Sequence, residues 1–99
     1  MPIKYAGLRA LDELEKFKLK QLSERYYKKI EIFLKNNPLL EVIIKKHDIT
    51  GKRSRISLKA KASAPNIRYS TTAEDWDITR AIHKVLSKLE REIKHKIKD

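Results

Sequence analysis

The longest amphipathic pattern in the chain covers residues 8–36, a stretch that contains neither Gly nor Pro. Apolar side chains recur there at the helical period and predict one long helix. They form a single stripe made of Leu8, Leu11, Leu19, Leu22, Tyr26, Ile30 and Phe33. The helix is expected to end at Asn36 and Asn37, because Pro38 disfavours helical backbone in the residue before it. Leu14, Phe17 and Tyr27 lie outside the stripe.

A different pattern follows Pro38, in which apolar and polar residues alternate as they do along half-buried strands. It predicts three strands, at residues 39–47, 54–64 and 67–73. The alternation is strictest in the second strand, where one side carries Ile56, Leu58, Ala60 and Ala62. Turns are expected at residues 49–52, which include a Gly, and at residues 64–66, which include a Pro.

The helical period returns at residues 75–98 and predicts a second helix. Its apolar stripe consists of Ile78, Ile82, Val85, Leu86, Leu89, Ile93 and Ile97. Acidic side chains of Glu74, Asp75 and Asp77 gather at its start, where they suit the positive end of the helix dipole. Asp75 is the expected N-cap residue.

The predicted element order is therefore α-β-β-β-α within one domain, residues 1–99. Each element has one apolar side, so the helices are expected to pack on one face of a sheet. This is an α+β fold with an antiparallel sheet of three strands, or of four if residues 1–7 add an edge strand through Ile3 and Tyr5.

Charge adds a second kind of information, because 24 Lys and Arg face 13 Asp and Glu, for a net charge of +11. Such a balance is typical of proteins that bind a polyanion, most often a nucleic acid. A lysine-rich surface that only reflects a heat-adapted proteome is the alternative. The distribution of the charges favours the first interpretation.

The last helix carries a row of cations that no acid interrupts, at helical steps of three and four residues: Arg80, Lys84, Lys88, Arg91, His95 and Lys98. Like charges at this spacing destabilise a helix slightly, so the row is best explained by phosphates that neutralise it. A plain solvated helix face is the other explanation. A second set points away from the helices on the sheet: Lys45, Arg55, Lys59, Lys61 and Arg68. Two basic surfaces on opposite sides suit insertion between RNA segments.

Catalysis finds little support in the sequence. The three histidines, His47, His83 and His95, lack the spacing of metal ligands on one helix face. There is no Cys, and two Gly cannot form a Gly-rich phosphate loop. We therefore expect no enzymatic activity, no cofactor, no metal and no small-molecule substrate. Without a long apolar run or a secretion signal, the protein is expected to be cytoplasmic, soluble and independent of membranes.

Two regions resemble a known family. The last helix has an acidic start at Ala73–Asp77, an Ala81–Ile82 pair in its first turns and a Lys-Leu-Glu-Arg core at residues 88–91. The segment GKRSRISLKAKAS at residues 51–63 forms a basic hairpin strand. Together they resemble the ribosome hibernation promoting factor and ribosome-associated translation inhibitor family, over residues 40–98. The chain departs from the family at its start, where no clear first strand precedes the long helix.

The resemblance implies a β-α-β-β-β-α fold related to the double-stranded RNA-binding domain. It implies binding in the mRNA and tRNA channel of the small ribosomal subunit and inhibition of translation in resting or stressed cells. It further implies that five residues of the last helix contact ribosomal RNA: Lys88, Arg91, Lys94, His95 and Lys98. The chain lacks the extension of the long members, so a monomer that acts like the short type is expected.

Two alternatives remain at this point. A double-stranded RNA-binding domain has the same α-β-β-β-α order, but it places lysines where this chain has Glu74, Asp75 and Asp77. A protein-interaction module would use the first helix through Phe17 and Tyr27. Trp76, in the first turn of the last helix and off its stripe, is expected either to pack on the sheet edge or helix one, or to contact RNA or a ribosomal protein.

Overall fold

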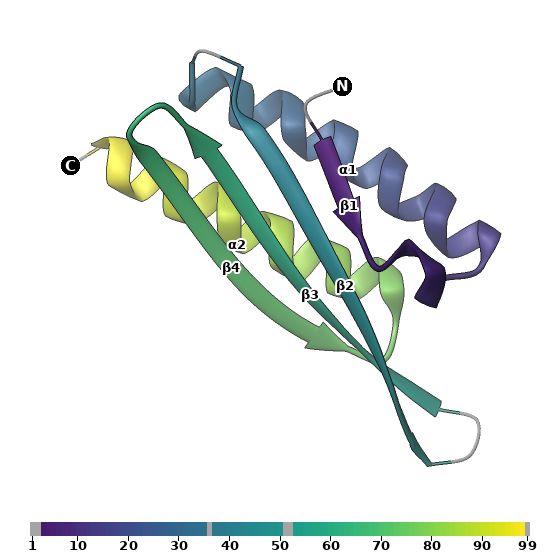
Figure 1. The fold of residues 1–99 in the computed structure, drawn as a ribbon. Helices are drawn as coiled ribbons and strands as arrows, with labels where there is room; N and C mark the ends of the chain where they lie inside the picture. Colours follow the sequence, from purple (N-terminus) through teal and green to yellow (C-terminus); the bar gives the residue numbers. More distant parts are fainter. Residues whose placement is uncertain (1–2, 36, 51–52, 99) are drawn as a thin grey trace.

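The structure is a computed structural model that describes residues 3–35, 37–50 and 53–98, with side chains at 48–50, 53, 97 and 98 left aside. Figure 1 shows one sheet with two helices on one of its faces. The α+β prediction is thereby confirmed. The elements are β1 (Ile3–Ala6), a 3-10 helix η1 (Leu8–Ala10), α1 (Glu13–Phe33), β2 (Leu39–Thr50), β3 (Arg53–Ala64), β4 (Ile67–Asp75) and α2 (Ile78–Lys98).

The sheet has four strands in the order β1-β2-β3-β4, so the predicted fourth strand exists. The β2–β3 and β3–β4 pairs are antiparallel, as predicted. The β1–β2 pair is parallel, so the prediction of a fully antiparallel sheet is wrong at this edge. The reason is that α1 connects these two strands, and a helical crossover returns the chain in the same direction. Ile3 and Tyr5 pair with Leu40 and Val42 and share their helix-facing side.

The first helix begins later than the pattern predicted, at Glu13 rather than at residue 8. Gly7 has a φ of 89°, and a Cβ there would collide with the carbonyl oxygen of Ile44, so the chain turns tightly after β1. Asp12 then caps α1: its Oδ1 accepts from the Glu15 N–H at 2.8 Å, and Glu15 Oε1 accepts from the Asp12 N–H at 3.0 Å. This reciprocal capping box fixes the start of the helix.

The core lies between the sheet and the two helices. Its fully buried members include Leu19, Ile30, Leu40, Leu58, Val85, Leu86 and Leu89. Tyr27 widens the α1 face of the core, because it is buried and its hydroxyl donates to the Pro38 carbonyl at 2.6 Å. Leu14 and Phe17 instead remain 63% and 62% exposed. Neither helix that the structure describes is long and apolar enough to cross a membrane.

The strands extend further than predicted toward one end of the sheet. β2 reaches Thr50 and β3 begins at Arg53, so their hairpin projects past the helices (Figure 1). Within the predicted turn at 49–52, residues 51 and 52 lie outside the described part of the chain. The second turn is confirmed between β3 and β4, with Asn66 at a φ of 67°.

The start of the last helix also differs from the prediction. Asp75 is the final residue of β4, and Asp77 caps α2 by accepting the Arg80 N–H at 2.9 Å. The prediction of Asp75 as the N-cap is therefore wrong. Trp76 precedes the helix rather than lying in its first turn. The alternation of β4 continues to its end, with Ala73 and Asp75 buried and Glu74 exposed.

Candidate nucleic-acid interface

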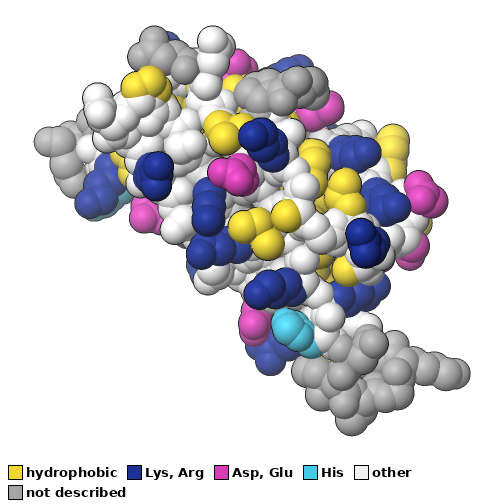
Figure 2. All heavy atoms as spheres, in the orientation of Figure 1, with side chains coloured by type: hydrophobic (Ala, Val, Ile, Leu, Met, Phe, Trp, Pro, Cys, Tyr) yellow, Lys and Arg dark blue, Asp and Glu magenta, His cyan; other side chains and the backbone are white. Residues whose placement is uncertain are grey.

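The face of the sheet that the helices leave uncovered is basic. Its predicted cations alternate with buried residues along β2, β3 and β4 and therefore point away from the core. Figure 2 shows Lys and Arg side chains spread over this side of the molecule, with few acids among them. We call this the open sheet face and define it by Lys45, Arg55, Lys59, Lys61 and Arg68.

Acidic side chains neutralise only part of the open sheet face. Glu74 Oε2 lies 2.8 Å from Arg55 Nη2, so this pair contributes little net charge. The other four cations make no ion pair with the described residues. Glu41 pairs in register with Lys61 across the β2–β3 ladder without an ion pair between their side chains. Most of the positive charge on this face is therefore available to phosphates.

The cations in the first half of α2 bind the neighbouring strand β4. Lys84 Nζ donates to the Glu74 carbonyl at 3.3 Å, and Lys88 Nζ donates to the Thr72 carbonyl at 3.0 Å. Both carbonyls belong to the edge strand of the sheet. These lysines therefore have a structural role that the helical pattern did not reveal.

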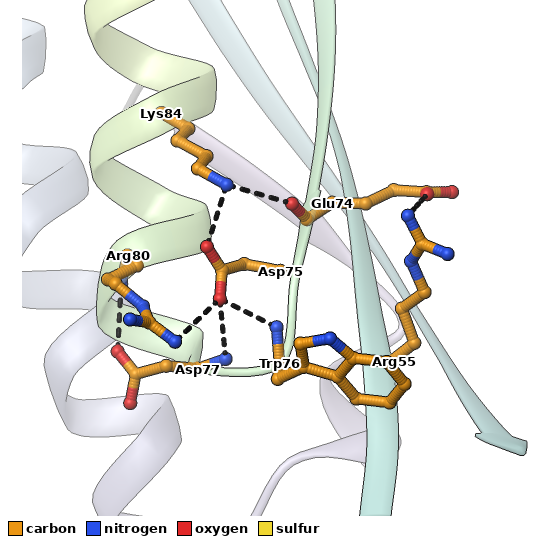
Figure 3. Close-up of polar contacts among 7 residues, drawn as sticks. All are labelled: Arg55, Glu74, Asp75, Trp76, Asp77, Arg80 and Lys84. Carbon is orange, nitrogen blue, oxygen red and sulfur yellow. Dashed lines mark hydrogen bonds and ion pairs between the residues drawn. The ribbon is translucent and has the colours of Figure 1, made fainter.

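Asp75 adds a carboxylate to the same region (Figure 3). Its side chain is buried, and it lies 2.7 Å from Lys84 Nζ and 3.1 Å from Arg80 Nη2. It also accepts the N–H groups of Trp76 at 2.7 Å and Asp77 at 3.1 Å. The basic row is thus uninterrupted along the helix, but an acid from β4 neutralises its beginning.

In the second half of the row, Arg91 directs its charge toward solvent. Arg91 and His95 lie with Lys88, Glu92 and two threonines around a groove between β4 and α2. We call it the β4–α2 groove, lined by Thr71, Thr72, Lys88, Arg91, Glu92 and His95. Arg91 is exposed and makes no ion pair with the described residues.

The two remaining candidates on α2 do not line this groove. Lys94 Nζ lies 3.1 Å from Glu90 Oε2 and 5.5 Å from the centre of the Phe33 ring, so it faces α1. The side chain of Lys98 lies outside the described residues. The structure therefore brings together only part of the predicted row.

The histidines take structural positions rather than a shared site. His83 Nδ1 lies 3.1 Å from the Tyr26 hydroxyl, which joins α2 to α1. His47 lies on β2 toward the projecting hairpin, and His95 lies in the β4–α2 groove. Among the described residues, no group of three or more His, Asp or Glu side chains could hold a metal ion.

The charge cluster shifts the pKa of Asp75. The Lys84 ammonium above all, and then the Asp77 N–H, hold this pKa well below its ordinary value of 3.8. Burial acts in the opposite direction but is the weaker influence. Because the unfolded chain binds a proton more readily, the carboxylate contributes stability above about pH 4, and this contribution is lost as the pH falls toward the folded-state pKa.

Asp75→Asn should lower the melting temperature at pH 7, because the neutral amide leaves Lys84 and Arg80 without their counter-charge. The difference from wild type should shrink as the pH is lowered from about 4 to 2, because the Asp75 carboxyl of the unfolded wild-type chain takes up a proton there while the folded carboxylate stays ionised. Thermal melts of both proteins from pH 7 to pH 2 measure this. Glu92→Gln, at an exposed acid without an ion pair to a described residue, serves as the control. A difference that stays constant over this range would contradict the assignment.

Comparison with solved structures shows that this fold, a mixed four-stranded sheet with two helices on one face, also occurs in other proteins of known structure. One similar structure is the N-terminal domain of Protein Y from Thermus thermophilus, with a TM-score of 0.60, 14% identity, and coverage of 95% of this chain and 93% of that one. Another is a ribosomal subunit interface protein from Coxiella burnetii, with a TM-score of 0.55, 16% identity, and coverage of 98% and 96%.

Comparison at the level of sequence does not assign the chain to a family. No protein-family model matches the chain, and no curated protein matches it. At 14% and 16% identity, the structural likeness concerns the fold. The arrangement of charges described above is therefore the basis for any statement about this chain's own site.

Proposed function

We propose that this chain binds the small ribosomal subunit through ribosomal RNA and inhibits translation in resting or stressed cells. The observation that carries the proposal is the basic open sheet face, together with the exposed Arg91 on α2, on a fold shared with a ribosomal subunit interface protein. The chain would act by occupying a site, without catalysis. The candidate RNA contacts are Lys45, Arg55, Lys59, Lys61, Arg68, Arg80, Lys84, Lys88, Arg91, Lys94, His95 and Lys98.

The candidate residues fall into two groups, according to whether an acidic side chain already forms an ion pair with them. The first group contains Lys45, Lys59, Lys61, Arg68 and Arg91, whose side chains have no acidic partner among the described residues. Arg55, Arg80, Lys84 and Lys94 already have one. Phosphates that bind the residues of the first group contribute more to the binding free energy, because no existing ion pair has to be broken.

The domain is thin enough to contact RNA on two opposite sides at once. The open sheet face and the outer side of α2 lie on opposite layers, and the shortest dimension of the molecule is 19 Å. In an RNA channel whose walls contact the sheet on one side and α2 on the other, phosphates would lie against the open sheet face and against Arg91. We infer from this geometry that the chain would obstruct the channel used by mRNA and tRNA.

Protein binding through α1 is the second candidate function. The specific observation is that Leu14 and Phe17, one helical turn apart, expose 63% and 62% of their surface. Exposed apolar pairs of this kind occur at protein contacts. The other alternative, a double-stranded RNA-binding domain, loses support because Asp75, at the end of β4, and Asp77, the cap of α2, lie where such a domain needs cations.

Cosedimentation in sucrose gradients tests the proposal. The protein should travel with isolated small subunits and not with large subunits, and it should inhibit a reconstituted translation reaction in proportion to the amount bound. Association that Phe17→Ala abolishes while the charges are intact would favour the protein-binding alternative. Absence of the protein from the small-subunit fractions at low salt would overturn the proposal.

The dependence on salt provides a physical measure of the same contact. If about six phosphates are neutralised, the logarithm of the affinity should fall with the logarithm of the salt concentration at a slope of about −4 to −5. Between about 50 and 200 mM salt this is a loss of several hundredfold. Binding measured by filter retention across this range checks the value. A slope shallower than about −2 would mean that phosphates contribute little.

A further inference from the structure

Trp76, the single Trp of the chain, lies between β4 and α2 and is 42% exposed. Buried aromatic residues of this protein behave differently: Tyr26 and Tyr27 are 8% and 7% exposed, and their hydroxyls bond to His83 and the Pro38 carbonyl. A single exposed aromatic ring is not by itself a contact site, but aromatic rings are enriched where proteins bind partners. The surroundings of Trp76 show what kind of contact it suits.

Arg55 lies beside the indole on the open sheet face (Figure 3). Its guanidinium carbon is 6.0 Å from the centre of the Trp76 ring, and its Nη2 is 2.8 Å from Glu74 Oε2. The carboxylate thus anchors the guanidinium near the ring. A planar cation and an aromatic ring that are held together are the two groups on which nucleobases stack.

The backbone under Trp76 is fixed on both sides. Its N–H donates to Asp75 Oδ1 at 2.7 Å, and Asp75 is itself held by Lys84 and Arg80. On the other side, Asp77 caps the first turn of α2. The indole is therefore presented from a rigid turn, which lowers the entropy lost when a ligand stacks on it.

A track of cations leads across the sheet from this position. In register, β2 and β3 bring Lys45 opposite Ser57, which lies two residues along β3 from Arg55. Lys59 follows two residues further along β3, about 7 Å from Ser57. The backbone of a single strand could follow these cations while one of its bases reaches the ring.

We propose that Trp76, with Arg55 beside it, stacks on an unpaired nucleobase of RNA bound along the open sheet face. This rests on the proposed function, because it names the chemical class of the RNA that the face takes: a single-stranded segment rather than a duplex, whose stacked bases would not be accessible to the ring. Stacking would be tolerant of sequence, since every base has a π-face.

The single Trp makes intrinsic fluorescence a direct report on this site. The intact chain is titrated at low salt with seven-nucleotide oligouridylate and oligoadenylate, and with an abasic ribose-phosphate oligomer of the same length. Binding is followed separately by the anisotropy of fluorescein-labelled oligomers. Both base-bearing oligomers should quench the Trp emission, and the abasic oligomer should bind without quenching it. Equal emission changes with all three, or no binding of the base-bearing oligomers, would overturn the inference.

Variants separate stacking from folding. Trp76→Leu should weaken binding of the base-bearing oligomers about tenfold and leave the abasic oligomer unchanged, whereas Trp76→Phe should retain most of the affinity. Phe17→Leu, at an exposed aromatic residue on α1, is the matched control and should change neither. A purely structural role of Trp76 would instead reduce both affinities together with the melting temperature, and this result would refute stacking.

The outcome is distinguishable from that of the proposed function. If the wild type cosediments with small subunits but no RNA oligomer quenches its fluorescence, stacking is refuted and ribosome binding stands. If Trp76→Leu weakens cosedimentation with small subunits but no oligomer quenches the emission of the wild type, the contact of Trp76 is not with an unpaired base and the inference also fails. Quenching by base-bearing oligomers without any cosedimentation would support stacking and overturn the proposed function.

Discussion

Lys59→Glu combined with Arg91→Glu should abolish cosedimentation with the small subunit while the domain stays folded. One residue lies on the open sheet face and the other in the β4–α2 groove, both exposed and without an acidic partner among the described residues. Each replacement removes a charged contact and adds a repulsion. A charged hydrogen bond contributes about 1.5–3 kcal/mol, so two losses weaken binding about a hundredfold or more.

The single variants show whether both faces touch RNA at once. Each should weaken association about tenfold, and their effects should multiply in the double variant if the contacts are independent. Lys20→Glu with Lys28→Glu, two exposed cations of α1, is the control of equal charge change and should bind like wild type. The proposed surfaces are wrong if the folded double variant also cosediments like wild type. Thermal melts of every variant establish that they are folded.

Leu89→Ala should have the largest effect on stability. Leu89 is 0% exposed in the stripe of α2 that packs on the sheet. Truncation of a buried Leu leaves a cavity and costs about 2–5 kcal/mol, against a total stability of about 5–15 kcal/mol for a domain. Urea unfolding followed by circular dichroism measures the difference. RNA affinity should fall as well, because α2 positions one of the two basic surfaces.

Leu14→Ala is the matched control for this change. The same side chain is removed, but from a site that is 63% exposed, so stability should change by less than about 0.5 kcal/mol. Comparable losses in the two variants would mean that Leu14 is buried in solution. That result would point to an association through α1 and would strengthen the protein-binding alternative.

Local patterns predicted the parts of the fold that local sequence determines. The alternation of apolar and polar residues, which is strictest around Leu58, predicted the three strands after Pro38, and the wide apolar stripe around Leu89 predicted the last helix. The start of α1 was wrong because the stripe continues through Leu8 and Leu11 into a 3-10 turn. The capping pair Asp12 and Glu15 was a sequence signal that would have corrected it.

Long-range pairing was the part that the sequence patterns could not supply. β1 has only four residues, and the whole of α1 separates it in the sequence from β2, its parallel partner. No turn sequence next to β1 therefore indicates this pairing. The same holds for the basic row. Its helical phase was predictable, but long side chains reach other elements, and the contacts of Lys84 with Asp75 and of Lys88 with Thr72 follow only from the packing of α2 beside β4.

The contacts of Lys84 and Lys88 with β4 also bear on how copies of this chain meet one another. An edge strand offers outward carbonyls on which a strand of another molecule can add, and that is a route to aggregation. Here ammonium groups already occupy the carbonyls of Glu74 and Thr72. A second molecule would have to displace two charges in order to extend the sheet. Replacing both lysines by Met would remove these donors, so it should free the two carbonyls and favour edge-to-edge pairing of two sheets without changing the core.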